Sequence, residues 1–247
     1  MIKFYRKIRQ NLLSEGKIVK YFKYAIGEIV LVVIGILIAL SINNWNNTKI
    51  SSKVEQNILE EIANGLNEDL PDVKHNIEGH KKGIKACIYW RKIINNEQVE
   101  TDSVALNYWN LTRNFVASQN ISSYESLKSR GLELITNDSL RLQIISLYET
   151  DYNILKTLEE DYDEFQFHKN YFKDINHFVS PHLVFNKEGD IQTIQIPLHL
   201  SEEEKKEFLS YLWKIEKNRN VALNYYSDLE KKIIQSKKNI DKKIAKD

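Results

Sequence analysis

Residues 24–42 read YAIGEIVLVVIGILIALSI, and this stretch decides how the chain is organised. Its nineteen residues carry one ionisable side chain, Glu28, and contain no proline. At the α-helical rise of about 1.5 Å per residue, the stretch covers roughly 28 Å, which is close to the thickness of the hydrocarbon core of a bilayer. The sequence therefore predicts one helix that crosses a membrane and contacts the lipid bilayer.

Charge is distributed unequally on the two sides of this stretch. Residues 1–24 carry a net charge of +6, and residues 43–247 carry a net charge of −4. Cytoplasmic segments of membrane proteins carry an excess of lysine and arginine, so we expect a cytoplasmic N-terminus and an exported remainder. The basic residues that set this topology, or that contact anionic lipid, are Lys3, Arg6, Lys7, Arg9, Lys17, Lys20 and Lys23.

Three aromatic residues, Tyr21, Tyr24 and Trp45, flank the apolar stretch, where amphipathic rings anchor a helix at the membrane interface. A cleaved signal peptide is the competing interpretation, with Ala39 and Ser41 as the small residues before the cut. Against it, the basic segment is long and no polar region separates the apolar run from the cut. We favour an uncleaved anchor, and both interpretations export the rest of the chain.

Composition predicts a mainly α fold. Eight glycines and three prolines in 247 residues are few helix breakers. We expect a basic cytoplasmic segment at 1–23, a transmembrane helix at 24–42, and an extended antiparallel helical-bundle ectodomain at 43–247 with a small β-hairpin near 183–196. The single cysteine, Cys87, has no partner within the chain for a disulfide, and a net charge of +1 gives no sign of a nucleic-acid partner.

One face of the predicted membrane helix carries small and ionisable residues. Glu28, Gly35 and Ala39 are separated by seven and four residues, which places them on one helical stripe. Gly35 and Ala39 form a small-xxx-small pair of the kind that lets two membrane helices approach closely. We expect this stripe to dock to another membrane protein or to a second copy; the alternative is that Glu28 simply reaches the headgroups.

Two blocks of sequence carry a resemblance to a family. Residues 23–46 read KYAIGEIVLVVIGILIALSINNWN, and residues 123–153 read SYESLKSRGLELITNDSLRLQIISLYETDYN. They resemble an uncharacterised family of bacterial single-pass membrane proteins, classed as a domain of unknown function. The resemblance covers most of the chain and is weak between Gly79 and Ser122. It implies the bacterial inner membrane and a periplasmic ectodomain, and it supplies no activity and no catalytic residue.

The first ectodomain helix is expected to reach about Asn95, kinked at Pro71, with a hairpin near Gly79 as the alternative. Its apolar stripe follows an eleven-residue repeat. The repeat consists of Ile62, Val73 and Ile84 together with Leu66, Ile77 and Ile88. Residues 96–138 predict short helices, one capped by Asp102 and one ending at Gly131, which we place at the end of the bundle farthest from the membrane.

Two further long helices are expected. The first starts at Asn137, Asp138 or Ser139 and ends at Pro181, with a largely aromatic seam at Ile144, Tyr148, Leu155, Leu158, Tyr162, Phe165, Phe172 and Val179. The second begins with a capping box formed by Ser201 and Glu204. Its heptad runs through Phe208, Leu212, Ile215, Ala222, Tyr226, Leu229, Ile233 and Ile240, with Arg219 and Ser236 as exceptions, and the charged tail after Ser236 is expected to fray.

Candidate chemistry is sparse. Asp72 with His75, and Asp174 with His177, form two D-x-x-H pairs, but the spans that carry them would have to meet by chance to bind a metal. Cys87 lies on an apolar stripe and is interpreted as an inert core thiol. No phosphate-binding, nucleophile-elbow or zinc-protease motif occurs. We therefore expect no cofactor, no metal and no enzymatic activity.

Three functional hypotheses remain. We prefer a membrane-anchored periplasmic scaffold or accessory subunit of an inner-membrane complex. The second is a periplasmic ligand-sensing bundle that signals through a membrane partner, which would need a pocket lined by the aromatic seam. The third is an anchored periplasmic enzyme or metal protein.

Overall fold

The computed structural model describes residues 18–246, with side chains described from residue 22 onward. The chain divides into two compact units, one ending at Glu55 and the other comprising Gln56 to the C-terminus. The long helix α2 (Ile18–Ile94) contributes to both units. The side chains expected to set topology at Lys3, Arg6, Lys7, Arg9, Lys17 and Lys20, and the interface aromatic Tyr21, lie outside the described residues.

In the first unit, the large apolar side chains of α2 are exposed to solvent all round the helix. No described residue from 22 to 53 is buried, and Leu31 is 69% exposed. A helix that is apolar all round suits a lipid environment, because in water its surface would be costly to hydrate. Among the described residues, α2 is the one helix long and apolar enough to cross a membrane. This feature agrees with the expected apolar helix at 24–42.

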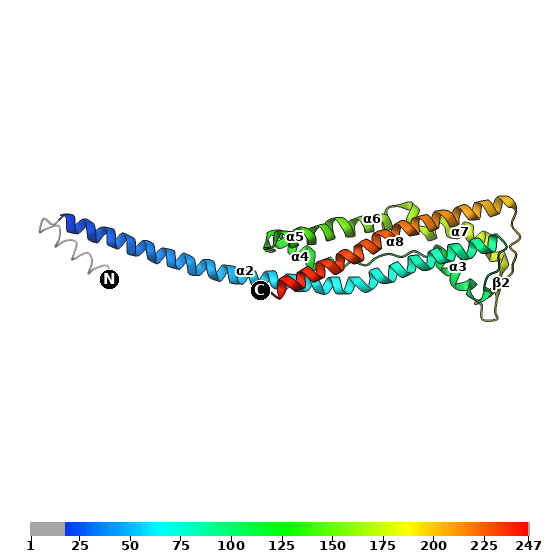
Figure 1. The fold of residues 1–247 in the computed structure, drawn as a ribbon, viewed down its shortest axis with the longest axis horizontal. Coiled ribbons are helices and arrows are strands. Elements are labelled where there is room, and N and C mark those ends of the chain that lie inside the picture. Colours follow the sequence, from blue (N-terminus) through cyan, green and yellow to red (C-terminus); the bar gives the residue numbers. More distant parts are fainter. Residues whose placement is uncertain (1–17, 247) are drawn as a thin grey trace. The chain divides into compact units, whose positions relative to one another are not determined.

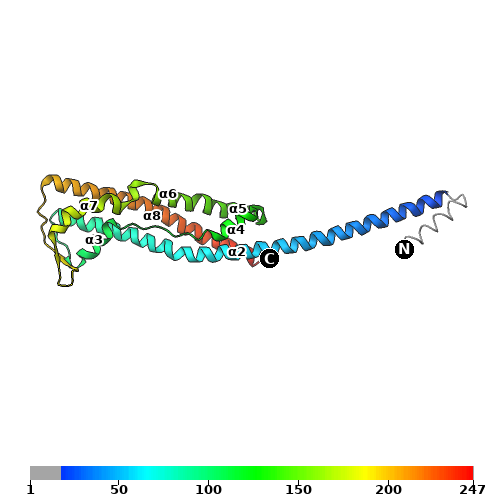
Figure 2. The same cartoon turned by 180° about the vertical axis from the view of Figure 1, so that it is seen from behind.

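In the second unit, α8 (Glu202–Ile244) runs antiparallel to residues 56–94 of α2, as Figures 1 and 2 show. Two ion pairs join these helices, between Arg91 and Glu216 and between Lys74 and Glu230. The helix α2 is continuous through Pro71 and ends at Ile94, as expected, so the alternative of a hairpin near Gly79 is wrong.

Gly79 and Gly83 are sites of close packing rather than helix breaks. A Cβ at Gly79 would lie 2.2 Å from the ring of Phe115, and a Cβ at Gly83 would lie 2.3 Å from Nε of Arg219. The missing side chains therefore make room for two residues that come from distant parts of the sequence.

The eleven-residue repeat of α2 holds only in its first half. Ile62, Leu66, Val73 and Ile77 are buried, but Ile84 is half-buried and Ile88 is exposed, so this part of the prediction is wrong. After Gly83 the buried side chains are Ala86, Cys87, Trp90, Ile93 and Ile94. The buried face rotates because the repeat is interrupted where Arg219 packs against Gly83.

The middle of the chain forms short elements at both ends of the second unit. These are η1 (Thr101–Ser103), α3 (Val104–Thr112), α4 (Ser122–Arg130) and η2 (Leu132–Leu134). Tyr108 of α3 donates to Asn176, whereas Tyr124 of α4 stacks on Tyr148. The expectation that all these pieces cap the far end is therefore wrong for α4. Asp102 also does not cap α3, whose N-cap residue is Ser103.

The expected long helix from residue 138 to residue 180 is broken. It consists of α5 (Asp138–Ile145), the π-helical segment η3 (Ser146–Tyr152), α6 (Asn153–Glu160), η4 (Asp163–Phe165) and α7 (Phe167–Val179). The Gln166 side chain donates to the Glu159 carbonyl, and the Asn170 side chain donates to the Asp163 carbonyl. Side-chain amides thus replace helical hydrogen bonds at the break, as polar side chains do at helix ends.

The break also changes which residues form the aromatic seam. Tyr162 is 54% exposed, and Phe165 and Phe172 are only half-buried. The buried residues of α7 are Phe167, Tyr171, Ile175, Phe178 and Val179, of which Val179 alone belongs to the predicted seam. The seam predicted from one continuous heptad is therefore correct at Ile144, Tyr148, Leu155 and Val179 and wrong at Tyr162.

The last elements largely follow the prediction. After η5 (Ser180–His182), strands β1 (Leu183–Phe185) and β2 (Ile191–Ile194) pair antiparallel with Leu183 opposite Ile194, which confirms the hairpin. The capping box is present at the start of α8, and all the predicted heptad residues are buried. The C-terminal tail does not fray before Ile244, because Ile240 is fully buried in the core.

Candidate functional site

The residues of the predicted membrane stripe lie on an open helix surface. Glu28, Gly35 and Ala39 are all exposed, and a Cβ at Gly35 would meet no atom within 4 Å. Their spacing puts them on one face of α2. The space beside Gly35 on this face is therefore open.

The aromatic residues at the two ends of the apolar stretch are also exposed, Tyr24 at 61% and Trp45 at 67%. Nζ of Lys49 lies 5.7 Å from the centroid of the Trp45 ring, close enough for a cation–π contact. Lys23, the one described side chain of the basic set, is exposed. The pairing of Lys49 with Trp45 was not predicted, although their spacing of four residues on a helix could have indicated it.

The second unit is organised around an extended segment, residues 113–121, which we call the strap. Backbone amides of the strap donate to carboxylates on helices: Ser118 to Asp72 at 2.8 Å and Asn120 to Asp69 at 2.9 Å. The amide of Ala117 donates to Glu159 of α6 at 3.1 Å. Because an extended chain has no internal hydrogen bonds, these carboxylates supply the acceptors for its backbone amides.

Arg219 of α8 holds the start of the strap from the other side. Its Nη2 donates to the carbonyls of Asn110, Leu111 and Arg113 at 3.3, 3.0 and 2.8 Å. Its guanidinium carbon lies 4.2 Å from the centroid of the Phe167 ring. Burial lowers the pKa of Arg219 to about 10, so the side chain remains charged at neutral pH. The heptad exception at this position is thus a buried cation that binds backbone carbonyls.

Two buried titratable groups, Glu159 and His80, both contact Tyr226 of α8. Tyr226 donates to Glu159, and burial raises the pKa of Glu159 to about 7. His80 packs its ring against Phe115 and Tyr226, with both centroid distances at 5.4 Å. Burial, followed by the charge of Arg219, lowers the pKa of His80 to about 3. Neither ring nitrogen of His80 has a hydrogen-bond partner among the described residues.

A second buried carboxylate, that of Asp69, ties α2 to η3. Tyr152 donates to Oδ2 of Asp69 at 2.6 Å, and burial raises the pKa of Asp69. Tyr152 in turn stacks edge-on against Tyr148. The aromatic seam is therefore coupled through Asp69 to the strap, a connection that sequence spacing could not reveal because Asp69 and Tyr152 are 83 positions apart.

The candidate metal and thiol groups are not brought together. Asp72 accepts from the strap, and the ring of its neighbour His75 lies edge-on to Phe115 at 6.4 Å between centroids. Within residues 18–246, no group of three or more His, Cys, Asp or Glu side chains is arranged to hold a metal ion. Burial raises the pKa of Cys87 to about 12, so the thiol is protonated and unreactive at neutral pH.

Comparison with known proteins places the chain in a family without assigning it a function. No curated protein and no solved structure matches it. The family of unknown function DUF6090 matches residues 28–178, from the apolar stretch to α7. This confirms the resemblance to an uncharacterised family. Because the match spans more than half of the 247 residues, the chain belongs to the family of unknown function DUF6090.

Proposed function

We propose that this protein is a single-pass anchor of the bacterial inner membrane that carries a periplasmic helical bundle and acts as a non-enzymatic scaffold or accessory subunit of a membrane complex. The observation that carries this proposal is the open apolar surface of α2, on which no residue from 22 to 53 is buried. Lipid and a partner helix are the two surroundings that suit such a surface.

The orientation follows from charge. The net charge of +6 before Ala25 keeps the N-terminus in the cytoplasm, and the acidic remainder is exported. The exported part extends from residue 43, and its helices form the antiparallel bundle.

The stripe of Glu28, Gly35 and Ala39 supplies the contact with the partner. Small residues let the backbones of two helices approach, and a carboxylate within a membrane helix is retained where a polar partner compensates it. The partner is another membrane protein or a second copy of this chain.

The interior of the second unit supports a scaffold over a ligand sensor. The rings of Tyr124 and Tyr148 are stacked with centroids 4.5 Å apart, and Tyr152 packs edge-on against Tyr148 at 5.3 Å. These rings pack against one another, so the space between them is filled by side chains rather than by a ligand. Exposed aromatic side chains at Trp109 and Trp213 instead offer contact points on the surface.

Purification of the tagged full chain in mild detergent tests the proposal. A stoichiometric membrane partner, or a stable homo-oligomer, is expected. The double variant Glu28→Ala with Gly35→Leu should lose that partner, because it removes the carboxylate and fills the close approach. The matched control is Val30→Leu with Leu37→Ala, which changes volume on the opposite face and should retain the partner. Equal assembly of both variants would contradict the role of the stripe.

Fractionation tests the anchor itself. The full-length chain should stay in the membrane pellet after alkaline extraction, and a protease added to the periplasm should degrade residues after Ile42. A soluble mature chain that lacks its first forty or so residues would instead identify the apolar stretch as a signal peptide.

A further inference from the structure

A small cleft lies between the π-helical segment η3 and α8, wholly within the second unit. Its volume is about 390 Å³, near the lower end of the usual range for small-molecule sites, about 300–1,000 Å³. Polar side chains of α5 and η3 line one wall, and polar side chains of α8 line the other. Leu147, which is fully buried, adds apolar surface. The cleft involves no part of the apolar stretch, so it does not depend on the proposed anchor.

One lining residue, Ser236, is not explained by the packing of α8. Together with Arg219, it is one of two residues of the buried heptad that are not hydrophobic, and it is 1% exposed. Its hydroxyl has no hydrogen-bond partner among residues 22–246. A buried hydroxyl without a partner costs free energy, whereas an alanine at the same position would carry no such cost. A ligand in the cleft would supply the partner that the protein does not.

The wall opposite Ser236 has an unusual backbone. The segment η3 is π-helical and interrupts the α-helical course between α5 and α6. Turns of this kind are rare and occur frequently at functional sites. This segment contributes Ser146, Leu147 and Asp151 to the cleft. The irregular backbone and the unexplained serine therefore meet at the same place.

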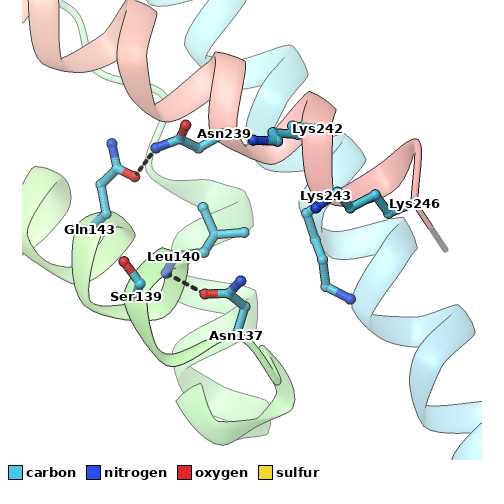
Figure 3. A pocket seen from close by; sticks show the side chains of 8 residues that line it. All are labelled: Asn137, Ser139, Leu140, Gln143, Asn239, Lys242, Lys243 and Lys246. Atoms are coloured by element: carbon cyan, nitrogen blue, oxygen red, sulfur yellow. Dashed lines mark hydrogen bonds between the residues drawn. The ribbon is translucent and has the colours of Figure 1, made fainter.

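Two glutamines line opposite walls of the cleft, and Asn239 links them. Nε2 of Gln235 donates to Oδ1 of Asn239 at 3.0 Å, and Nδ2 of Asn239 donates to Oε1 of Gln143 at 2.7 Å. Figure 3 shows the second bond, with the amide nitrogen of Gln143 directed away from Asn239. These bonds run in one direction, so Nε2 of Gln143 is left to donate and Oε1 of Gln235 is left to accept. That pair complements the carbonyl and the N–H of a single amide group.

The charges around the cleft balance one another. Nζ of Lys232 lies 2.8 Å from Oδ1 of Asp151 and 2.9 Å from Oδ2 of Asp228. With Lys231, which also lines the cleft, these residues carry two positive and two negative charges. The surroundings therefore favour a neutral ligand over an ionic one.

We propose that this cleft binds a small neutral molecule that carries a secondary amide and hydroxyl groups, as an N-acetylated monosaccharide does. The carbonyl of the amide accepts from Gln143, and its N–H donates to Gln235. Hydroxyl groups of the ligand pair with Ser146 and Ser236. Within the described residues, the lining includes none of the stacked tyrosines, so the site is separate from the filled aromatic seam.

A ligand-observed NMR titration of the full chain tests the proposal, in a detergent without a sugar headgroup. The probe is N-acetylglucosamine, and the comparison is glucose, which has a hydroxyl in place of the acetamido group. N-Acetylglucosamine should bind about tenfold more tightly than glucose, because glucose lacks both hydrogen-bonding groups of the amide. Equal affinity for the two sugars, or no binding of N-acetylglucosamine, would overturn the proposal.

Substitutions locate the binding. Gln143→Met and Gln235→Met nearly keep the length of each side chain and remove its hydrogen-bonding groups, so each should weaken the binding of N-acetylglucosamine by about threefold to tenfold. Gln192→Met is the matched control, because Gln192 is exposed on β2 and lies outside the cleft. The control should bind like the wild type. Affinity unchanged in both cleft variants would refute the assignment of the two glutamines.

Ser236→Ala separates a ligand-binding hydroxyl from a structural one. The variant should weaken the binding of N-acetylglucosamine by about threefold to tenfold without lowering the thermal stability of the second unit, because the hydroxyl has no protein partner among residues 22–246. A loss of stability with unchanged affinity would show that the hydroxyl serves the fold, and the role of Ser236 in the site would then be wrong.

Discussion

The apolar stretch and the second unit differ in where they place apolar and polar side chains. From residue 22 to residue 53 of α2, apolar side chains are exposed and none is buried. In the second unit, the largest fully buried side chains include Arg219, and Asp69, His80 and Glu159 are nearly as deeply buried. The first region is defined by its overall apolar character and the second by specific hydrogen bonds. We therefore expect the first region to tolerate any substitution that keeps it apolar. In the second region, the effect of a substitution on stability should depend on its position.

Arg219→Ala gives the largest expected effect. It removes the donor from three backbone carbonyls and opens a cavity beside Phe167, so we expect a loss of about 3–5 kcal/mol in the free energy of unfolding of the second unit. Hydrogen exchange at the strap amides of Ala117 and Ser118 should become faster, and the free energy of opening derived from it should fall by a similar amount. Denaturant unfolding of the full chain in detergent measures the first quantity.

The control is Lys217→Ala, an exposed residue two positions earlier on the same helix, which should change stability by no more than about 0.5 kcal/mol. If Arg219→Ala were as mild as this control, the strap would not depend on the buried cation.

Two buried groups, Glu159 and His80, are expected to change the folding stability with pH in opposite directions. The pKa of Glu159 is raised to about 7 in the folded state, so its folded form binds more protons and stability rises as pH falls from 7 towards the usual value near 4.5. The pKa of His80 is lowered to about 3, so its unfolded form binds more protons and stability falls below pH 6.5. The two effects oppose each other between pH 4.5 and 6.5.

Single substitutions should unmask each effect. With His80→Leu, stability should rise as pH is lowered from 7 to 5, with a slope approaching about 1.4 kcal/mol per pH unit. With Glu159→Gln, stability should fall over the same range, since the histidine effect is no longer offset. Urea unfolding at several pH values measures both slopes, and profiles parallel to the wild type in both variants would show that the two groups are not buried as described.

Gly79→Leu should destabilise the second unit by about 1–3 kcal/mol, because the new side chain overlaps the Phe115 ring that holds the strap against α2. Gly27→Leu is the matched control in the apolar stretch, where a Cβ would meet no atom within 4 Å. Thermal unfolding of both variants compares the two positions. Equal stability would mean that Phe115 moves away without loss.

The periodicity of the sequence predicted the features that depend on residues within a single helix. The heptad of α8, its capping box and the end of α2 at Ile94 all follow from local pattern. Contacts between distant segments could not be predicted in this way. The break after α6 depends on the amides of Gln166 and Asn170, and the strap depends on carboxylates about fifty positions away.

The candidate sites divide in the same manner. The stripe at Glu28, Gly35 and Ala39 can be read from spacing because it lies on one helix. Arg219 was noted as an exception to a heptad, but its role required knowledge that the carbonyls of residues 110–113 lie opposite.

A leucine-to-alanine substitution made once in each region compares the two regions directly, and its effect in the apolar stretch is the smallest that we expect. Leu37→Ala removes an exposed side chain from the apolar stretch, so it should change the unfolding free energy of the second unit by less than about 0.5 kcal/mol. Leu66→Ala, on the same helix but fully buried, should cost about 2–5 kcal/mol because it leaves a cavity. Denaturant unfolding of both variants in one detergent makes the measurement. A cost for Leu37→Ala close to that of Leu66→Ala would show that residue 37 packs against protein rather than lipid, and the contrast between the two regions would then be wrong.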